Sequence, residues 1–420
     1  MGTSSEQMTG TNGGRLAALN RWFDARFPAH KLIREHVSEY YAPKNFNFWY
    51  YFGSLAIVVL VIQVITGIFL AMSYTPSDVE AFQSIEYIMR EVEWGWLIRY
   101  LHSTGASAFF IVVYLHMFRA LLYGSYKAPR ELLWIIGMLI YVALMAEGFF
   151  GYVLPWGNMS YWGAQVIVSL FGAVPGIGEG LAEWIRGDYS ISDITLNRFF
   201  ALHVVAVPLL LIFLVVAHIL ALHEVGSNNP DGVEIKKHKK PDGTPLDGIP
   251  FHPYYTYKDL VGTGFFLILF AIVVFFAPTL GGYFLEPPNF EPANPLSTPE
   301  HIAPVWYFTP YYAILRAVPD KLVGAILMAL AIALFFFLPW LDRCKVKSVR
   351  YRGWIYKLFL AAFAVSFLVL MYSGLQPAQG TYVILARIFT AVYFAFFLLM
   401  PIYTQLEKTK PVPERVTFHA

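Results

Sequence analysis

Four histidines occupy matched positions in two apolar stretches of the chain. His102 and His116 are fourteen residues apart, and His203 and His218 are fifteen apart. Because an α-helix rises ~1.5 Å per residue, each pair spans ~20 Å, most of the thickness of a hydrocarbon core. An imidazole is costly at membrane depth and needs a partner there. Two parallel helices with such pairs can supply opposed axial ligands to two metal centres, one toward each side of a membrane.

A flat macrocycle that carries iron explains this pattern better than a bare metal ion. Zinc sites use three or four ligands that lie close together, whereas two isolated imidazoles at one level suit the two faces of a haem. Gly53 and Gly67 are fourteen residues apart, and so are Gly137 and Gly151. Because glycine has no side chain, a flat ring can approach the helix backbone at these positions. The two independent spacings predict two haems inside a four-helix bundle.

Three arginines each lie three to five residues from one of the histidines: Arg99, Arg119 and Arg198. Haem propionates are anionic, and a guanidinium binds such groups through paired hydrogen bonds. A single arginine near a membrane end can equally be an interfacial anchor. Three arginines beside three of the four histidines favour contacts with propionates.

The spacing of fifteen in the second pair differs from that in the first. At ~100° per residue, fourteen steps leave two side chains about 40° apart, and fifteen leave them about 60° apart in the other direction. Pro208 falls between His203 and His218. A proline or a π-bulge can absorb one extra residue in a helix. We therefore predict an irregular helix near residues 204–208.

The composition indicates that a membrane surrounds these residues. Of the 420 residues, 57% are hydrophobic and 14% are charged, whereas a soluble domain has roughly 25% charged residues. Apolar runs close to the ~20 residues that a spanning helix needs cover 47–72, 99–123, 132–155, 199–222, 258–278, 319–340, 353–373 and 380–403. The run at 159–174 is shorter and interrupted by Gly and Pro, so it predicts an interfacial helix. We expect an all-α membrane protein with eight transmembrane helices.

The basic residues have an uneven distribution. They gather before the first run, after the last run and in alternate loops between. By the positive-inside rule, this pattern places both termini in the cytoplasm. Residues 15–34 predict an amphipathic helix on the membrane surface. Cys344 is the only cysteine, which excludes an internal disulfide and an iron–sulfur cluster held by this chain alone.

The positions of the histidines and of the polar segments predict three parts. Residues 1–46 form a cytoplasmic amphipathic N-terminal segment, and residues 47–225 form a di-haem four-helix bundle. Residues 226–420 form a C-terminal four-helix domain with no histidine inside a span. A loop at 278–318, rich in Pro and Asn, divides the first two helices of this domain.

These residues and their surroundings resemble the cytochrome b family, the membrane core of ubiquinol–cytochrome c oxidoreductase. The similarity covers nearly the whole chain after about residue 20, and its motifs include IRYLHSTGAS, GYVLPWGNMSYWGA, LHEVGSNNPDG and NPLSTPEHIAPVWYFTPYYAILRAVP. It implies an outer b-type haem on His102 and His203 and an inner one on His116 and His218. Most relatives space the second histidine pair by fourteen, so the spacing of fifteen is a departure.

The resemblance also implies an inner pocket for quinone reduction, formed by His223, Ser227, Lys258 and Asp259. A quinone that gains two electrons must gain two protons, which His223 and Asp259 can donate near the cytoplasmic face. Lys258 can relay a proton or balance charge. Without the motif, His223 and Lys258 read equally well as loop residues at the interface.

The outer, quinol-oxidising pocket of relatives lies between GYVLPWG and a PEWY tetrapeptide whose glutamate accepts a quinol proton. Here the tetrapeptide is PVWY, made up of Pro304, Val305, Trp306 and Tyr307. Valine cannot take a proton. Glu286 and Glu300 lie in the same loop, and we expect Glu286 to replace the missing glutamate. Tyr152 and Tyr312 are expected to line the pocket.

The resemblance implies a divided electron path. Ubiquinol at the outer site gives one electron to a partner iron–sulfur protein, and the other electron crosses the two haems to quinone at the inner site. The chain has no CxxCH motif for covalent haem, so it needs a Rieske iron–sulfur protein and a cytochrome c-type subunit as partners. We also expect a homodimer of the complex, membrane lipids as partners, no nucleic acid, and a bacterial inner membrane.

Two other functions agree with part of the sequence. A di-haem membrane anchor of a dehydrogenase would pass electrons but would have only one quinone site. Eight spans and the GYVLPWG and PVWY segments argue against it. A transporter whose buried histidines relay protons would contain no haem.

Overall fold

The computed structural model describes residues 10–26 and 40–417. Within these residues, eight helices are long and apolar enough to cross a membrane: Phe48–Ala71, Gly95–Tyr123, Glu131–Val153, Asp193–Val225, Tyr254–Phe276, Lys321–Leu341, Trp354–Gly374 and Gly380–Leu398. The prediction of an all-α protein with eight spans is confirmed. The bounds differ from the predicted ones by up to six residues.

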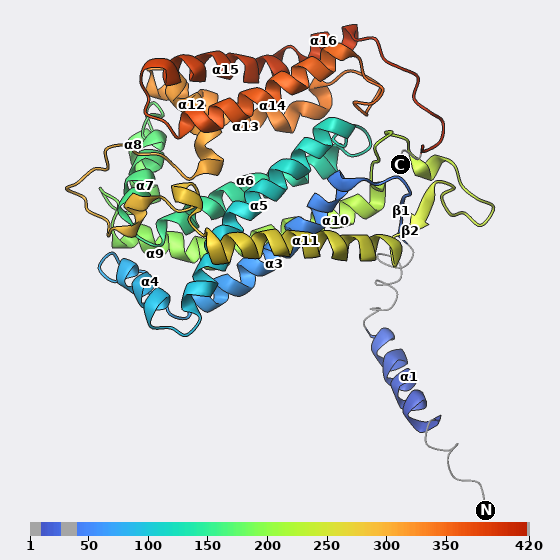
Figure 1. The fold of residues 1–420 in the computed structure, drawn as a ribbon, viewed down its shortest axis with the longest axis horizontal. Helices are drawn as coiled ribbons and strands as arrows, with labels where there is room; N and C mark the ends of the chain where they lie inside the picture. Colours follow the sequence, from blue (N-terminus) through green and yellow to red (C-terminus); the bar gives the residue numbers. More distant parts are fainter. Residues whose placement is uncertain (1–9, 27–39, 418–420) are drawn as a thin grey trace, which may run out of the picture.

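Figure 1 labels the helices in chain order. The long ones are α3 (Tyr51–Ala71), α5 (Gly95–Tyr123), α6 (Glu131–Val153), α10 (Val207–Val225), α11 (Tyr254–Phe276), α13 (Lys321–Leu341), α14 (Trp354–Gly374) and α15 (Gly380–Leu398). The shorter ones are α1 (Gly10–Asp24), α4 (Ala81–Arg90), α7 (Asn158–Phe171), α8 (Gly178–Arg186), α9 (Asp193–Ala201), α12 (Thr309–Ala317) and α16 (Met400–Leu406). Two short strands, β1 (Tyr41–Pro43) and β2 (Gly248–Pro250), pair antiparallel.

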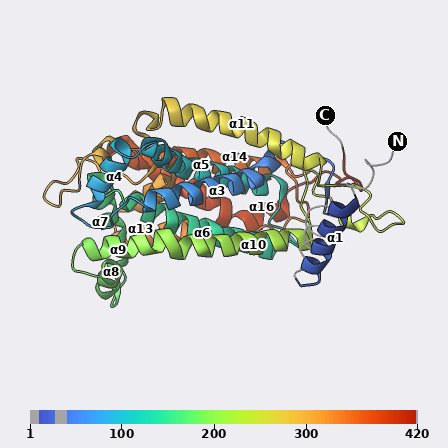
Figure 2. The ribbon, with the colours of Figure 1, turned by 90° about the horizontal axis from the view of Figure 1, so that it is seen from below.

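The long helices lie side by side along the long axis of the molecule (Figures 1 and 2). In one group α3 packs against α5, α10 packs against α6, and α11 lies along α3 and α5. In the other group α14 packs against α12 and α15. One hydrophobic core joins the two groups, with Met138 of α6 and Phe335 of α13 among its buried members.

The two ends of the molecule carry different loops. Strands β1 and β2 and the C-terminal residues lie at one end, which we call the terminal end, and α4, α7 and α8 lie at the other, the distal end (Figure 1). Helix α7 confirms a helix in the 159–174 run that does not span. Helix α1 covers the start of the predicted amphipathic segment at 15–34, and residues 27–39 lie outside the described part.

The fourth span is a continuous helix with a π-helical turn inside it. Residues Leu202–Ala206 form this turn between α9 and α10, and the backbone N–H of Val207 donates to the carbonyl of Leu202. A π-turn accommodates one extra residue, and Pro208, which lacks an N–H, follows directly. The predicted irregularity is confirmed, and it begins two residues before the predicted range.

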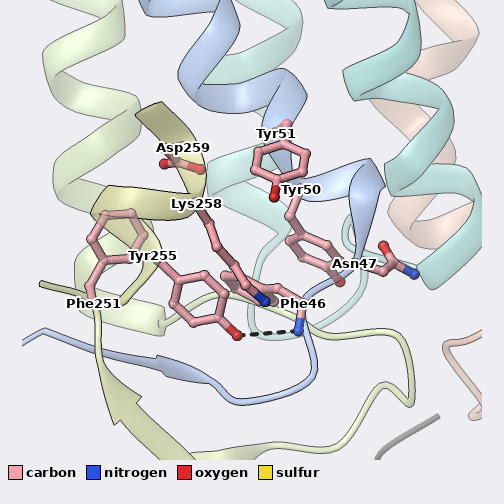
Figure 3. Close-up of a pocket in the computed structure, with 8 residues that line it drawn as sticks. All are labelled: Phe46, Asn47, Tyr50, Tyr51, Phe251, Tyr255, Lys258 and Asp259. Atoms are coloured by element: carbon pink, nitrogen blue, oxygen red, sulfur yellow. Dashed lines mark hydrogen bonds between the residues drawn. The ribbon is translucent and has the colours of Figure 1, made fainter. Parts of the chain in front are cut away.

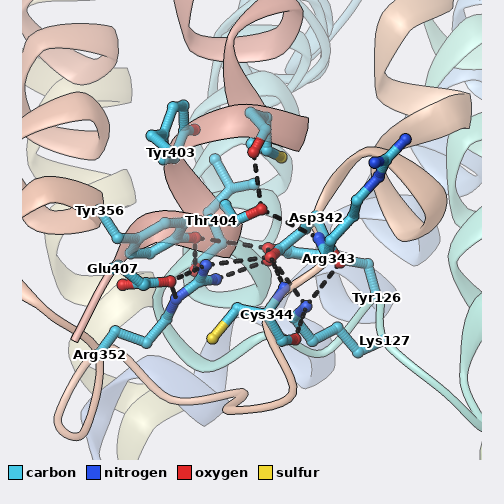
Figure 4. Close-up of polar contacts among 12 residues, drawn as sticks. Tyr126, Lys127, Asp342, Arg343, Cys344, Arg352, Tyr356, Tyr403, Thr404 and Glu407 are labelled. Carbon is cyan, nitrogen blue, oxygen red and sulfur yellow. Dashed lines mark hydrogen bonds and ion pairs between the residues drawn. The ribbon is translucent and has the colours of Figure 1, made fainter. Parts of the chain in front are cut away.

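A buried ionic network ties the two helix groups together at the terminal end (Figure 4). Arg352 donates to Asp342 at 2.6 Å and to Glu407 at 2.6 Å, and Lys127 contacts Asp342 at 2.9 Å. Burial alone would raise the pKa of Asp342, but the charges of Arg352 and Lys127 hold it below the usual value. Because Lys127 follows α5 and Glu407 follows α16, the network links loops that are far apart in the sequence.

Candidate functional site

The four histidines form two pairs between α5 and the fourth span, in which His203 lies in the π-turn and His218 in α10. The ring centroids of His102 and His203 are 6.1 Å apart, and those of His116 and His218 are 6.4 Å apart. Two metal–nitrogen bonds of ~2.0 Å between opposed imidazoles place ring centroids ~6 Å apart. Both pairs therefore fit a metal centre with two axial imidazoles, and the His102–His203 pair lies nearer the distal end.

Contacts at Nδ1 leave the other ring nitrogen of the distal histidines available as a ligand. The Nδ1 atom of His102 is 2.9 Å from the hydroxyl of Thr66, and this hydroxyl donates to the carbonyl of Ile62 at 2.6 Å. The Nδ1 atom of His203 is 3.0 Å from a carboxylate oxygen of Glu147 and 3.1 Å from its carbonyl oxygen. An imidazole that donates from Nδ1 presents the lone pair of Nε2 to a metal.

The surroundings of the terminal pair are different. The Nδ1 atom of His116 is 3.4 Å from the guanidinium of Arg119. The buried Nδ1 of His218 lies near the backbone of Leu133 without a hydrogen bond of normal geometry to any described residue. Within residues 10–26 and 40–417, no carboxylate forms an ion pair with either ring, unlike Glu147 beside His203.

The four predicted glycines each face one histidine ring. A Cβ atom built on Gly53, Gly67 or Gly137 would lie 3.2 to 3.3 Å from the Cε1 atom of the histidine ring that faces it. A Cβ atom built on Gly151 would collide with the ring of His203. The pairs are Gly67–His102, Gly151–His203, Gly53–His116 and Gly137–His218. Since two glycines face each pair, a larger side chain at any of them would fill the space in which the imidazoles meet.

The predicted propionate-binding arginines occupy different surroundings. Arg119 is half-buried and lies over the ring of Tyr50 at 4.9 Å, and its Nε atom is buried with no partner in the described residues. Such an unpaired donor suits an anionic group. Arg99 lies one turn before His102 on α5. Arg198 is exposed, and its guanidinium donates to the carbonyl of Trp184 at the end of α8.

Glu286 lies against Tyr152 at the distal end. The hydroxyl of Tyr152 donates to Oε2 of Glu286 at 3.3 Å, and burial raises the pKa of Glu286 to about 7. The alternative acid, Glu300, is exposed. The loop that carries Glu286 is fixed to the GYVLPWG segment by backbone bonds, since Ala293 donates to the carbonyl of Trp156 at 2.9 Å.

The PVWY residues form a wall beside this loop. The ring of Tyr307 stacks on Phe110 at 3.8 Å, and the indole N–H of Trp306 donates to Ser107 at 3.0 Å. Val305 is buried, and Pro304 precedes it in the connection to α12. The hydroxyl of Tyr312 donates to the carbonyl of Ile302 at 3.1 Å. These bonds hold the aromatic rings in place.

At the terminal end, Lys258 and Asp259 of α11 line a cavity of about 40 Å³. Its other lining residues are Phe46, Asn47, Tyr50, Tyr51, Phe251 and Tyr255 (Figure 3). The ammonium of Lys258 lies 4.5 Å from the centre of the Tyr254 ring. Ligand pockets normally enclose ~300–1,000 Å³, so a quinone ring needs side chains to move before it fits.

His223 and Ser227 meet at a different side chain, Tyr40. The rings of His223 and Tyr40 stack at 4.4 Å, and the hydroxyls of Tyr40 and Ser227 are 2.7 Å apart. Phe251, which lines the cavity, lies beside Tyr40 with a centroid distance of 6.1 Å. The four predicted residues therefore form two adjacent clusters that share an aromatic wall.

Comparison with known proteins agrees with this geometry. Residues 37–226 match the family described as cytochrome b/b6/petB, and residues 292–394 match the one described as cytochrome b(C-terminal)/b6/petD. The chain is 64% identical to a cytochrome b of Allochromatium vinosum over 94% of this chain and 97% of that protein. This chain belongs to the cytochrome b family.

More distant relatives support the same assignment. A cytochrome b of Rickettsia bellii is 50% identical over 96% of this chain and 98% of that protein. A chain of the solved structure named "Hyperthermophilic respiratory Complex III" matches with a TM-score of 0.85 and 40% identity, over 92% of this chain and 98% of that chain. As a cytochrome b, the protein is a haem-binding, multi-pass membrane subunit of ubiquinol–cytochrome c oxidoreductase and takes part in electron transfer.

Glu147 and Tyr40 are among the residues of this cytochrome b that contact predicted site residues and were not themselves predicted from the sequence. The sequence did offer a signal for Glu147, because it is the only acidic residue in the apolar run 132–155. An ionisable residue inside a membrane span usually has a function. Tyr40 had no such signal, because its partners His223 and Ser227 lie more than 180 residues away in the sequence.

Proposed function

We propose that this cytochrome b holds two b-type haems, oxidises ubiquinol at the distal end and reduces quinone at the terminal end. His102 and His203 would hold one haem, and His116 and His218 the other. The observation that carries the proposal is the pair of centroid distances, 6.1 and 6.4 Å, between opposed imidazoles. The two haem sites, which lie between the distal and the terminal quinone pockets, would form one route for electrons through the chain.

When bound, the two haems supply one-electron transfer across the bilayer. The chain would position them, because the four imidazoles would hold the haems and four glycines keep the space beside the imidazoles free. The unpaired Nε of Arg119 is available to an anionic propionate beside the terminal pair.

At the distal pocket, Glu286 accepts a quinol proton and carries it outward. Its raised pKa of about 7 suits this task, because an acceptor works best near the working pH. The hydroxyl of Tyr152 orients the carboxylate, and the fixed rings of Trp306 and Tyr307 form the wall. The PVWY segment then shapes the pocket, and the proton acceptor comes from another part of the same loop.

At the terminal pocket, Asp259 and His223 donate the protons that a reduced quinone requires. Lys258 balances negative charge on the quinone oxygens. The hydroxyl groups of Ser227 and Tyr40 lie next to His223 and make this side of the pocket polar. The small cavity beside Lys258 and Asp259 is the entrance that the quinone ring would widen.

The remaining proposals concern the surroundings of the chain. A Rieske iron–sulfur protein and a cytochrome c-type subunit would take the first electron, in a homodimeric complex. The distribution of basic residues favours a position of the terminal end and both termini in the cytoplasm. The PVWY variant and the long polar N-terminus resemble proteobacterial relatives and favour a bacterial inner membrane. We also propose the division into an N-terminal segment (1–46), a haem-binding bundle (47–225) and a C-terminal domain (226–420).

Haem quantitation with a reduced-minus-oxidised spectrum of the purified protein tests the proposal. We expect two b-type haems per chain, and His203→Leu and His218→Leu should each remove a different one. Two quinone-site inhibitors that act independently would exclude the rival dehydrogenase anchor, which has one quinone site. A protein without any haem spectrum would favour a proton-relaying transporter and overturn the proposal.

A further inference from the structure

One acidic side chain in the interior of a membrane span has no role in the electron and proton route described above. Glu147 lies in α6 within the sequence LMAEGFF, six residues before the end of the helix. A carboxylate at this depth is costly and needs a specific partner.

The partner of Glu147 is a metal-ligating candidate. Its Oε1 atom is 3.0 Å from Nδ1 of His203, and both side chains are largely buried, with 16% of each exposed. Its Oε2 atom is buried and has no hydrogen-bond partner among the described residues. The carboxylate is therefore not neutralised by an arginine or lysine of the described chain, and its contact to His203 stands alone.

The N–H at Nδ1 of His203 donates to the backbone carbonyl of Glu147 at 3.1 Å, which fixes the tautomer and the ring orientation. The carboxylate beside the same nitrogen adds a negative charge, which raises the basicity of the nitrogen that faces the metal. A more basic ligand donates more electron density and stabilises the oxidised metal, so the reduction potential falls.

We propose that Glu147 is a positioning residue that orients His203 and lowers the reduction potential of the haem at the distal pair. The proposal rests on the proposed function, because it requires a haem between His102 and His203. The backbone carbonyl of Glu147 already lies 3.1 Å from Nδ1 of His203. The side chain thus adds a negative charge to a ring that the backbone alone could orient.

The terminal pair gives an internal comparison. His116 faces the guanidinium of Arg119 at 3.4 Å, and His218 has no carboxylate beside it. Glu147 therefore affects one pair of ligands only. If Glu147 lowers the reduction potential of the distal haem and leaves that of the terminal haem unchanged, electron flow from the distal to the terminal end is favoured.

Redox titration of both haems in the intact complex tests the inference, with Glu147→Gln and Glu147→Leu compared with the unchanged protein. Gln keeps the shape and the acceptor oxygen but removes the charge, and Leu removes both. We expect the midpoint potential of the distal haem to rise in Glu147→Gln and to rise further in Glu147→Leu. The terminal haem should keep its potential. The distal haem is identified as the one lost in His203→Leu.

Thr66→Val is the matched control at the facing ring, because it removes a neutral acceptor from His102. Thr66→Val should raise the midpoint potential of the distal haem by less than Glu147→Gln does. An unmoved distal potential in Glu147→Gln, with both haems present, would overturn the inference, as would an equal shift of both haems. If the unchanged protein itself contains fewer than two haems, the proposed function fails instead, so the two failures are distinguishable. Should Glu147→Leu fail to assemble, Glu147→Gln alone decides.

Discussion

The hydroxyl of Tyr152 donates a hydrogen bond to Glu286 at 3.3 Å, joining the GYVLPWG segment to a loop 134 residues later. This contact distinguishes Glu286 from Glu300, the other acid considered as a proton acceptor. Glu286 is held against the aromatic wall, with its pKa raised by burial, whereas Glu300 is exposed. The proposed proton acceptor therefore comes from Glu286, in the same loop as Val305, which replaces the glutamate of PEWY.

Glu286→Gln should slow quinol oxidation strongly. Because a positioned proton acceptor contributes ~10²–10⁴-fold, we expect a loss of at least ~100-fold in turnover, measured as cytochrome c reduction by quinol. Glu300→Gln is the control, since Glu300 is exposed, and it should keep near-normal turnover. Normal turnover in Glu286→Gln would contradict the assignment.

The same residue predicts a pH dependence. A carboxyl with a pKa of about 7 is protonated below that pH and cannot accept a proton. The rate of quinol oxidation should therefore fall as the pH drops from 8 to 6, and Glu286→Gln should lose this part of the profile. A profile that is unchanged by the substitution would assign the titration to another group.

The glycines should act on one haem each. Gly67→Val places branched carbons next to His102, so we expect loss of the distal haem and retention of the terminal one. Gly53→Val, which faces His116, should do the reverse. Difference spectra measure both. Gly264→Ala on α11 is the control, because a Cβ there meets nothing within 4 Å.

Asp259→Asn should slow electron delivery to quinone at the terminal end. We expect a decrease of ~10–100-fold in the rate at which quinone reoxidises the haems, because a proton donor is lost. Reduction of the haems through the distal pocket should stay normal in the same preparation. A defect in both directions would indicate general damage to the protein.

The buried network around Asp342 should dominate stability at the terminal end. Asp342→Asn removes the negative charge that balances the buried cations Arg352 and Lys127. Breaking a buried ion pair lowers the free energy of unfolding by ~3–5 kcal/mol. Thermal unfolding followed by haem absorbance measures the loss. Glu86→Gln is the control, because the Glu86–Arg90 pair is on the surface and contributes less than ~1 kcal/mol.

The network has a matching pH dependence. The folded pKa of Asp342 lies below its usual value of 3.8, so its stabilising contribution is complete above that pH. It is lost as the pH falls through the folded value. The stability difference between the Asp342→Asn variant and the unchanged protein should therefore shrink only in strong acid.

The spans and the register of the ligands could be predicted because they depend on local sequence. Hydropathy over about twenty residues defines a spanning helix, and the spacing of fourteen or fifteen sets the distance between histidines along a helix axis. The extra residue before His218 predicted an irregular helix near residues 204–208, and the structure has a π-turn at Leu202–Ala206.

The tertiary structure alone decided which side chains meet across helices. The contact of Glu147 with His203, the stacking of Tyr40 on His223 and the contact of Tyr152 with Glu286 depend on how the helices rotate and where the loops return. Arg198 is an example: its distance along the chain from His203 predicts a propionate contact, whereas the hydrogen bond of its guanidinium to the carbonyl of Trp184 follows only from the fold. Spacing along one helix determines height in the membrane, whereas the direction of a side chain is set by packing against neighbours that are distant in the sequence.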